Sequence, residues 1–299
     1  MSGADAGLGP ISPALAERVE AETYADYEAA VPASARAAAG AGQFRIGGGV
    51  ALAIPGDATG YWNRVLGLGF AELISARLLT QVTGFYRQRG IAEATLALAP
   101  SVLPPDWAEL REEFSISAAP TATAKLACGI DAARARVAEN RARLADGLRV
   151  GPVAAGQARE FAEAKSTAFY GGISKAIYQN EMAHWIIGRP GWQSFAVFDD
   201  TAIVAVGSLH VADNVGHLFG GATRPEFRGR GAQSALIAAR VEAAWAAGCD
   251  WVVAEAAAGD NSSLRNQRRA GLRLRYGRQH WTWRDRPAAQ PAGLARAID

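Results

Sequence analysis

The segment from Thr223 to Gln233, T-R-P-E-F-R-G-R-G-A-Q, contains the residue types best suited to binding an anion. Gly229 and Gly231 allow the backbone to approach a ligand closely, because no Cβ stands in the way. Arg228 and Arg230 add positive charge, and successive backbone N–H groups in such a turn converge on one point. These features predict a binding site for a phosphate or a diphosphate.

The flanking sequence predicts the elements that position this turn. Residues 218–222 form an apolar run, and Ile237, Val241 and Trp245 recur at helical spacing after the turn. A strand, the turn and a helix therefore follow one another, and the helix N-terminus adds partial positive charge. A surface loop rich in arginine and glycine, without a ligand, is the alternative.

The order of strand, R-G-R-G-A-Q-S-A-L, helix, strand and helix resembles the coenzyme A pyrophosphate loop of the GNAT superfamily of acyl-CoA-dependent N-acyltransferases. That loop has the form R/Q-x-x-G-x-G/A, in which Arg228 fills the first position and Gly231 the fourth. Gln233 replaces the small residue at the sixth position, so its side chain must point away from the phosphates. The resemblance extends over residues 148–283.

The resemblance implies an α/β fold of the mixed α+β kind, with a mixed, mostly antiparallel central sheet flanked by helices. Residues 148–283 have the predicted order of a GNAT fold: a strand, two helices, three antiparallel strands, the loop and its helix, a parallel strand, a helix and a last strand. A similar order in the first half predicts an internal repeat. The chain would then contain two GNAT-like halves.

The first half lacks a basic turn. Leu66 to Phe70 reads L-G-L-G-F, a G-x-G without a basic residue, so a tight turn without phosphate is the favoured interpretation and a vestigial or alternative nucleotide site is the other. The pattern in this half also predicts a β-rich segment from Phe44 to Ile54, with a bulge or a close backbone approach at Gly47 to Gly49, and a strand from Asn63 to Phe70.

Shifts in composition and pattern predict the domain boundaries. The predicted segments are a disordered N-terminus at 1–11, a degenerate GNAT-like domain at 12–128, a linker at 129–147, a catalytic GNAT domain at 148–284 and a loose tail at 285–299.

The resemblance implies acetyl-CoA as the co-substrate. The residues expected to bind it are Ala222, Thr223, Arg228, Gly229, Arg230, Gly231, Ala232, Gln233, Asn261, Ser263 and Asn266. A backbone N–H of Ala222 or Thr223 would polarise the thioester carbonyl. Counting back from Gly271 places Asp260 at the family's asparagine position, which leaves the role of Asn261 open.

An amine acceptor has to lose a proton before it can attack. For an alkylammonium with a pKa near 10.4, neutralisation at pH 7 costs about 4.6 kcal/mol, so a general base is useful. Glu255, inside an apolar strand, should have a raised pKa unless it is paired, for example with Arg265. It is a candidate base or an anchor for a cationic acceptor, and His217 is the other candidate base, with a structural histidine as the alternative.

The departing thiolate has to gain a proton. GNAT proteins commonly use a tyrosine of the last helix, but Gln267 occupies the matching position and cannot serve. Tyr276 on the final strand is the proposed substitute, and a core tyrosine is the alternative interpretation.

The acceptor pocket of this fold would be formed by residues 169–185 and 276–283. Tyr170, Tyr178, Trp185, Trp192 and Trp281 would give it an aromatic lining, with Glu181 as a possible partner for a cation, but packing in the core is the favoured interpretation of these aromatic residues.

Composition limits the other partners. The chain of 299 residues is 49% hydrophobic and carries a net charge of only +2, so general binding of nucleic acid is not expected. We find no spacing of metal ligands, no signal peptide and no apolar run of membrane-spanning length, and therefore expect no metal, no membrane contact and a cytoplasmic protein. The sequence defines neither the oligomeric state nor the acceptor.

We therefore predict an enzyme, a GNAT-type N-acetyltransferase that transfers an acetyl group from acetyl-CoA directly to a primary amine of a small molecule or peptide. A non-catalytic acyl-CoA-binding or regulatory module is the alternative, because Gln233 and Gln267 depart from the family pattern.

Overall fold

The computed structural model describes residues 10–140, 143–172 and 177–285. Up to residue 140 the helices and strands are α1 (Pro13–Ala29), α2 (Ala33–Ala38), β1 (Gly42–Ile46), β2 (Gly49–Ala53), β3 (Arg64–Leu66), α3 (Ala76–Arg87), β4 (Glu93–Ala97), α4 (Trp107–Glu113), β5 (Ile116–Gly129) and α5 (Ile130–Asn140). Ser12 caps α1 by accepting a hydrogen bond from the Leu15 amide, as Ser12 followed by Pro13 favours.

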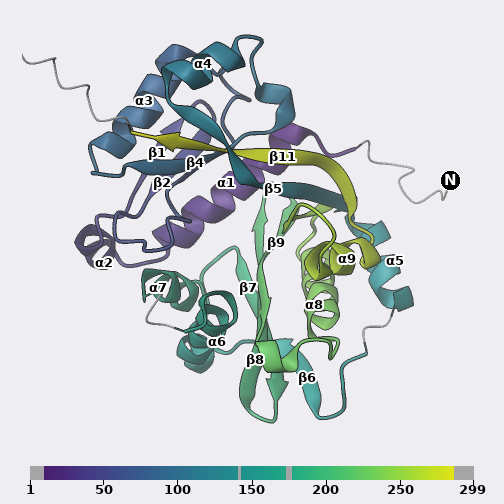
Figure 1. Cartoon of the computed structure of the whole chain (residues 1–299). Helices are drawn as coiled ribbons and strands as arrows, with labels where there is room; N and C mark the ends of the chain where they lie inside the picture. The colour runs from purple at the N-terminus through teal and green to yellow at the C-terminus, as the bar shows by residue number, and fades with distance from the viewer. Residues whose placement is uncertain (1–9, 141–142, 173–176, 286–299) are drawn as a thin grey trace, which may run out of the picture.

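The second half begins at residue 148. Its elements are β6 (Leu148–Pro152), α6 (Ala158–Tyr170), α7 (Ile177–Trp185), β7 (Trp192–Asp199), β8 (Ala202–Ala212), β9 (Val215–Thr223), α8 (Ala232–Ala246), β10 (Trp251–Ala257), α9 (Ser262–Arg269) and β11 (Arg273–Arg284). Figure 1 shows α6 and α7 on one side of these strands and α8, α9 and α5 on the other. Within the described ranges, no helix is long and apolar enough to cross a membrane.

All the described strands belong to one sheet, in the order β1-β2-β3-β4-β11-β5-β10-β9-β8-β7-β6. The pairs β3–β4 and β9–β10 are parallel, and the other neighbouring pairs of this sheet are antiparallel. This arrangement confirms the predicted mixed, mostly antiparallel sheet flanked by helices.

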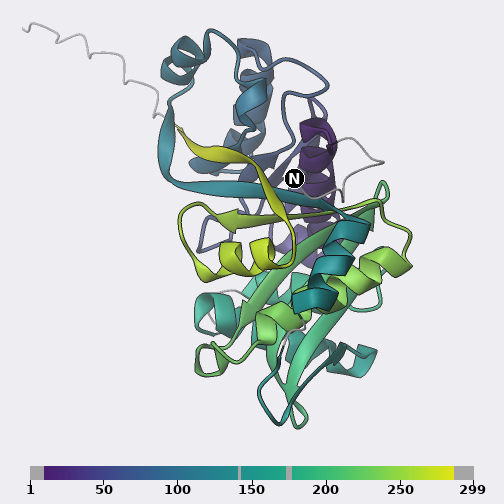
Figure 2. The same cartoon turned by 90° about the vertical axis from the view of Figure 1, so that its right-hand side faces the viewer.

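The two halves exchange their last strands. β5, which ends the first half, pairs with β10 of the second half, and β11, which ends the second half, pairs with β4 of the first. β5 and β11 also pair with each other at the centre of the sheet. In Figure 2 these two long strands cross side by side between the halves. Each half therefore depends on the other to complete its sheet.

Helix α1 crosses from one half to the other. It packs against β2 and β3 of the first half and against β8 and β9 of the second. Val19, together with Ile11 before the helix, is buried against Val215, Trp251 and Val253. The predicted disordered segment 1–11 lies outside the described residues except for Pro10 and Ile11, and the buried Ile11 is packed in the core.

A cluster of buried charges joins α1 to the exchanged strands. The Arg278 guanidinium on β11 binds Glu17 at 2.6 Å and Glu20 at 2.5 Å, and the Lys125 ammonium on β5 binds Glu20 at 2.5 Å. Burial favours a protonated Glu20, but Arg278 and Lys125 outweigh that effect and hold its pKa well below the usual range. The Glu20 carboxylate therefore remains charged, and with Arg278 and Lys125 it links three elements from distant parts of the sequence.

Two of the predicted strands in the first half are wrong in extent. Gly47 and Gly48 adopt φ values of +56° and +82° and form the hairpin turn between β1 and β2, instead of a bulge within one strand. Two successive residues at positive φ reverse the chain with the twist that a hairpin needs. The strand predicted from Asn63 to Phe70 is limited to β3, because Gly67 turns away at φ +71°.

We predict that Glu20→Gln lowers the free energy of unfolding by about 3–5 kcal/mol, because it removes the charge shared by Arg278 and Lys125 in a buried site. The matched control is Glu242→Gln, which breaks the exposed Arg134–Glu242 pair and should cost less than about 1 kcal/mol. Urea unfolding of both variants measures the difference. Equal losses would contradict a central role for the buried cluster.

The same cluster predicts how stability changes in acid. Because the folded-state pKa of Glu20 is lowered, its contribution is present above the unfolded-state pKa of about 4.3 and is lost as the pH falls below that value. Unfolding at pH 3 to 7 should therefore show a shallower acid loss in Glu20→Gln than in the native protein. An identical pH dependence of the two proteins would argue against this assignment.

Candidate active site

A cavity of about 1560 Å³ runs along one edge of the sheet and is lined by both halves. β11 runs antiparallel to β4 and β5. The same edge of the sheet therefore contains the starts of β3, β4 and β5 and the ends of β9, β10 and β11. The α6 helix and the turn before α8 also line it. The cavity therefore connects the predicted coenzyme loop with residues of the first half.

The parallel strands β9 and β10 separate where the cavity begins. They pair from Val215 to His217 on β9 and from Trp251 to Val253 on β10, and beyond these residues the two strands part. The backbone of residues 218–223 then faces the cavity on the side that β10 has left. This opening provides a strand edge along which an extended ligand can lie.

A β-bulge shapes β9 at this opening. The register with β8 shifts between the pairs Val206↔Ala222 and Ser208↔Phe219, so that Gly220 and Gly221 lie opposite a single residue. Gly220 has φ +61°, a conformation that favours glycine. The bulge turns backbone groups of β9 toward the cavity beside the predicted oxyanion donors Ala222 and Thr223.

The turn before α8 presents unpaired backbone amides. Within the described ranges, the N–H groups from Gly229 to Ser234 donate no hydrogen bond, and the N-cap residue Gly231 provides no side-chain cap. These amides lie at the positive end of α8, and Arg228 is beside them on the cavity wall. The donor set fits a diphosphate, since it offers several N–H groups and a guanidinium without a competing carboxylate.

Gly231 has a second role that the sequence motif does not reveal. A Cβ at this position would lie 2.0 Å from the Arg143 carbonyl oxygen, so the segment before β6 packs directly against the turn. The Ala145 amide donates to the Arg230 carbonyl oxygen in the same contact. Gly229, in contrast, has open space where a Cβ would be. The turn is thus supported from behind at Gly231 and accessible at Gly229.

The cavity wall includes most of the predicted coenzyme residues. Those that line it are Ala222, Thr223, Arg228, Gly229, Gly231, Ala232, Gln233, Ser263 and Asn266. Arg230 does not line the cavity, and its guanidinium lies over the Phe227 ring at 5.0 Å. Asn261 does not line it either, since its side chain caps α9 by accepting from the Leu264 amide. The Gln233 amide turns to the Thr223 hydroxyl, away from the loop amides as predicted.

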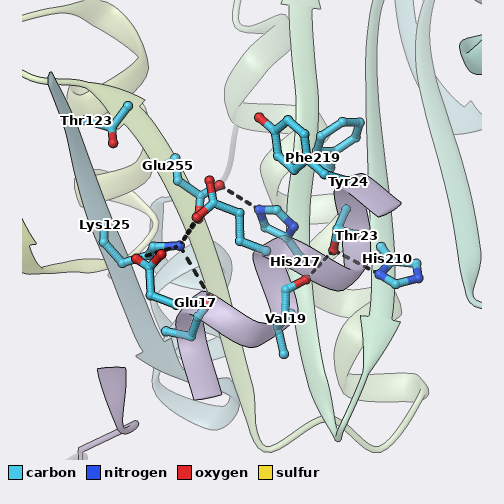
Figure 3. Close-up of polar contacts among 12 residues, drawn as sticks. Glu17, Val19, Thr23, Tyr24, Thr123, Lys125, His210, His217, Phe219 and Glu255 are labelled. Carbon is cyan, nitrogen blue, oxygen red and sulfur yellow. Dashed lines mark hydrogen bonds and ion pairs between the residues drawn. The ribbon is translucent and has the colours of Figure 1, made fainter. Parts of the chain in front are cut away.

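Glu255 lines the cavity, but both of its carboxylate oxygens are engaged. Oε1 accepts from the Lys125 ammonium and Oε2 from His217 Nε2, each at 2.7 Å, so that Lys125, Glu255 and His217 follow one another across three strands (Figure 3). Burial and Glu20 raise the pKa of Glu255, but His217 and Lys125 outweigh them and hold it below its usual value. Arg265 instead pairs with Asp260, so the suggested Arg265–Glu255 pair is wrong.

His217 is fully buried, and its Nδ1 has no hydrogen-bond partner within the described residues. It does not line the cavity. The structure therefore brings both predicted bases together as a pair, with Glu255 between His217 and the solvent-filled space.

Tyr276 is placed away from the cavity. Its hydroxyl donates to Glu17 Oε1 at 2.8 Å, and burial together with Glu17 raises its pKa. Because it does not line the cavity, the geometry gives no support to Tyr276 as the acid for the thiolate. Gln267 does line the cavity, and its buried Oε1 lacks a partner within the described ranges.

Both halves contribute aromatic rings to the wall of the cavity. The rings of Tyr24, Tyr27 and Trp62 pack on one another and on Phe219 of β9, with centroid distances of 4.9–5.5 Å. Of the predicted aromatic set, only Tyr170 lines this space, and Glu181 instead accepts from the Trp185 indole. The sequence pattern missed these residues because α1 and β3 approach β9 only in the folded chain.

Lys165 on α6 is a further residue that sequence reasoning missed. Its ammonium group lies 2.8 Å from the Tyr27 hydroxyl, 4.7 Å from the Phe219 ring centroid and 2.6 Å from where a Gly220 Cβ would be. The side chain is only 8% exposed, and burial, with a smaller effect from Arg240, lowers its pKa to about 7. A lysine that loses its proton near neutral pH therefore lies at the β9 bulge.

The turn of the first half is filled by the protein itself. A Cβ at Gly67 would lie 3.0 Å from Ala21 of α1, and one at Gly69 would lie 2.7 Å from Val102. Leu68 between them is buried. These contacts favour the interpretation as a tight turn without phosphate.

Within the described part of the chain, no group of three or more His, Cys, Asp or Glu side chains could hold a metal ion.

Comparisons with known proteins agree with this geometry. Residues 159–271 match the model of the acetyltransferase (GNAT) family. A GCN5-related N-acetyltransferase from Kribbella flavida is similar in structure, with a TM-score of 0.58, 17% identity, and coverage of 92% of this chain and 96% of that chain. A tandem GNAT protein from the clavulanic acid biosynthesis pathway has a TM-score of 0.58 at 15% identity and covers 82% of each chain.

A GCN5-related N-acetyltransferase from Sphaerobacter thermophilus has a TM-score of 0.54 at 19% identity, over 71% of this chain and 68% of that chain. No curated protein sequence matches this chain. At these identities the structures establish the fold, which is the tandem GNAT fold in mixed α/β form. Residues 159–271 are the part of the chain that matches the family model, and the chain as a whole has the fold of tandem GNAT proteins.

Two glycine variants test whether the turn is packed against residue 143 at Gly231 and open at Gly229. Gly229→Ala and Gly231→Ala both place alanine at positive φ, which costs about 1–2 kcal/mol. Gly231→Ala must in addition displace the Arg143 carbonyl, so we expect it to lower the free energy of unfolding further than Gly229→Ala does. Urea unfolding compares the two, and equal costs would contradict the contact between the turn and residue 143.

Proposed function

We propose that this protein is an acetyl-CoA-dependent N-acetyltransferase that transfers the acetyl group directly to a primary amine. The main support is that β9 and β10 separate beside the unpaired amides of Gly229 to Ser234, at one end of a cavity that continues to Lys165. The diphosphate of acetyl-CoA would bind these amides and Arg228. Its pantetheine arm would lie along residues 218–223 of β9.

Direct transfer places the reacting groups at the bulge. The thioester carbonyl would accept a hydrogen bond from the N–H of Ala222 or Thr223, which stabilises the negative charge that forms on its oxygen. The amine nitrogen forms a bond to the carbonyl carbon, the carbon–sulfur bond breaks, and the coenzyme leaves as a thiolate. A thiol has a reference pKa of about 8.5, so its thiolate is stable enough to leave first and to be protonated by solvent afterwards.

Lys165 is the proposed acceptor of the proton from the amine. At its pKa of about 7 a large fraction of the side chain is neutral at physiological pH, and its nitrogen lies at the bulge where the thioester would be. Glu255 is less suited to this role, because its lowered pKa makes it a weak base and both oxygens are already engaged. Use of acetyl-CoA agrees with the cytoplasmic location expected from the sequence.

Calorimetric titration of acetyl-CoA tests the first part of the proposal. Arg228→Ala should weaken binding about 10- to 100-fold, as expected for loss of a charged hydrogen bond. Arg230→Ala is the matched control and should have a smaller effect, because Arg230 lies over Phe227 outside the cavity. No binding to the native protein would refute the coenzyme assignment.

Thiol release over a panel of primary amines then separates the two candidate functions. Release with at least one amine supports the transferase. Binding of acetyl-CoA with no release favours the non-catalytic acyl-CoA-binding or regulatory module. That alternative is supported by the absence of an acid at Gln267 and by the Tyr276 hydroxyl being engaged with Glu17.

The role of Lys165 predicts a pH profile. The rate should rise with pH and level off above about pH 7, as Lys165 loses its proton. Lys165→Met should lower kcat by about 10²- to 10⁴-fold without loss of acetyl-CoA binding, and Lys165→Arg should be equally slow because arginine keeps its charge. If Lys165→Met keeps the native rate and profile, the proton acceptor is elsewhere, and Glu255→Gln becomes the variant to measure.

The same residue links stability to pH in a defined direction. Because its folded-state pKa is lowered to about 7, the unfolded state holds the proton up to about pH 10.4, so this residue makes unfolding less favourable as the pH rises from 7 to 10. Lys165→Met should lack this increase. Urea unfolding at several pH values compares the slopes, and equal slopes would show that Lys165 titrates normally in the folded protein.

A further inference from the structure

Arg64 is a buried cation at the end of the cavity formed by the first half. It begins β3, is only 6% exposed and lines the cavity. Its Nε donates to the Tyr61 carbonyl oxygen at 2.7 Å, and its guanidinium lies over the Tyr61 ring at 3.7 Å. These two contacts leave its terminal nitrogens without a hydrogen-bond partner among the described residues.

No carboxylate within the described residues forms an ion pair with Arg64, and its terminal N–H groups donate no hydrogen bond there. Burial lowers the pKa of Arg64, but Tyr61, Tyr24 and Glu20 outweigh this effect and raise it. The Glu20 oxygens are already bound by Arg278 and Lys125. Buried charges in proteins are normally paired and fully hydrogen-bonded. Arg64 therefore lacks the anion that its surroundings require.

The other cations at this end of the cavity have partners. Arg278 binds Glu17 and Glu20, and the exposed Arg284 at the rim pairs with Glu93 at 2.8 Å. The Arg240 guanidinium donates to the carbonyl oxygens of Leu236, Ser208 and Phe219. Arg240 lies on α8 at the β9 bulge, so a ligand anion entering the first-half end of the cavity would find its free donors at Arg64.

We propose that Arg64 binds a carboxylate of the acceptor, so that the substrate is a primary amine that also carries a carboxylate. A guanidinium presents two parallel N–H groups that match the two oxygens of a carboxylate. This inference rests on the proposed transferase function, because the amine of the same molecule must reach the β9 bulge near Lys165.

The aromatic wall sets the spacing between the two ends of the acceptor. The Arg64 guanidinium carbon is 5.5 Å from the Tyr24 ring centroid, Tyr24 is 5.3 Å from Phe219, and the Phe219 centroid is 4.7 Å from the Lys165 ammonium. An acceptor that joins Arg64 to the bulge therefore has to pass along these two rings. It should carry an apolar segment between its carboxylate and its amine.

Matched acceptors test the carboxylate directly. The probes are ω-amino acids from glycine to 6-aminohexanoate, each compared with its primary carboxamide, which has nearly the same shape without the charge. In thiol-release assays the longer acids should exceed their amides in kcat/KM by at least about 10-fold, as expected for a charged hydrogen bond. Arg64→Gln should remove this preference, so that each acid and its amide react with similar kcat/KM.

Two variants control for the fold and for general charge. Arg284→Gln removes a rim cation that is already paired and should retain the acid preference. Arg64→Lys keeps the charge but not the two parallel donors, so it should keep the fold and lose most of the preference. Thermal unfolding confirms that each variant is folded before its kinetics are interpreted.

The outcomes separate this inference from the proposed function. Equal kcat/KM for acids and amides would overturn the carboxylate site and leave the transferase intact. Absence of thiol release with every amine would count against the transferase. In that case titration of 6-aminohexanoate and its amide into CoA-saturated protein decides the carboxylate site, which requires binding of the acid alone and loss of that binding in Arg64→Gln.

Discussion

Buried ion pairs at the centre of the sheet hold the two halves of this protein in one arrangement. Arg278, Glu20 and Lys125 form their core, and Glu255 with His217 extends it to the cavity. Charges removed from water must be compensated by partners at close range, so each side chain fixes the position of the next. Because these residues belong to α1, β5, β9, β10 and β11, the cluster aligns the exchanged strands and the wall of the site together.

The exchange of strands gives the site its composite character. The second half contributes the parted strands, the bulge and the turn with free amides, while the first half contributes aromatic rings and Arg64. The turn of the first half that corresponds to the coenzyme loop is filled by Ala21 and Val102. One half therefore has the features expected to bind the coenzyme, and the other forms a wall of the same cavity, where we propose that the acceptor binds.

The features that could be predicted from the sequence are those that depend on residues close together in the chain. The turn from Arg228 to Gln233 and the order of strands and helices around it follow from local spacing, and both agree with the structure. Contacts between distant segments could not be predicted in this way. The environment of Lys165 depends on Tyr27 of α1, which lies 138 positions away. Glu255 was a candidate base because its partner Lys125, 130 positions away, could not be recognised from local spacing.

A crystal structure with bound CoA would show whether one composite cavity binds the coenzyme along β9 and brings its sulfur to the first-half wall. We expect the diphosphate to lie on the amides of Gly229 to Ser234 and the sulfur to lie beside Gly220 and Lys165. Density for CoA at the turn of Gly67 to Gly69, or a coenzyme whose sulfur points away from Lys165, would contradict it.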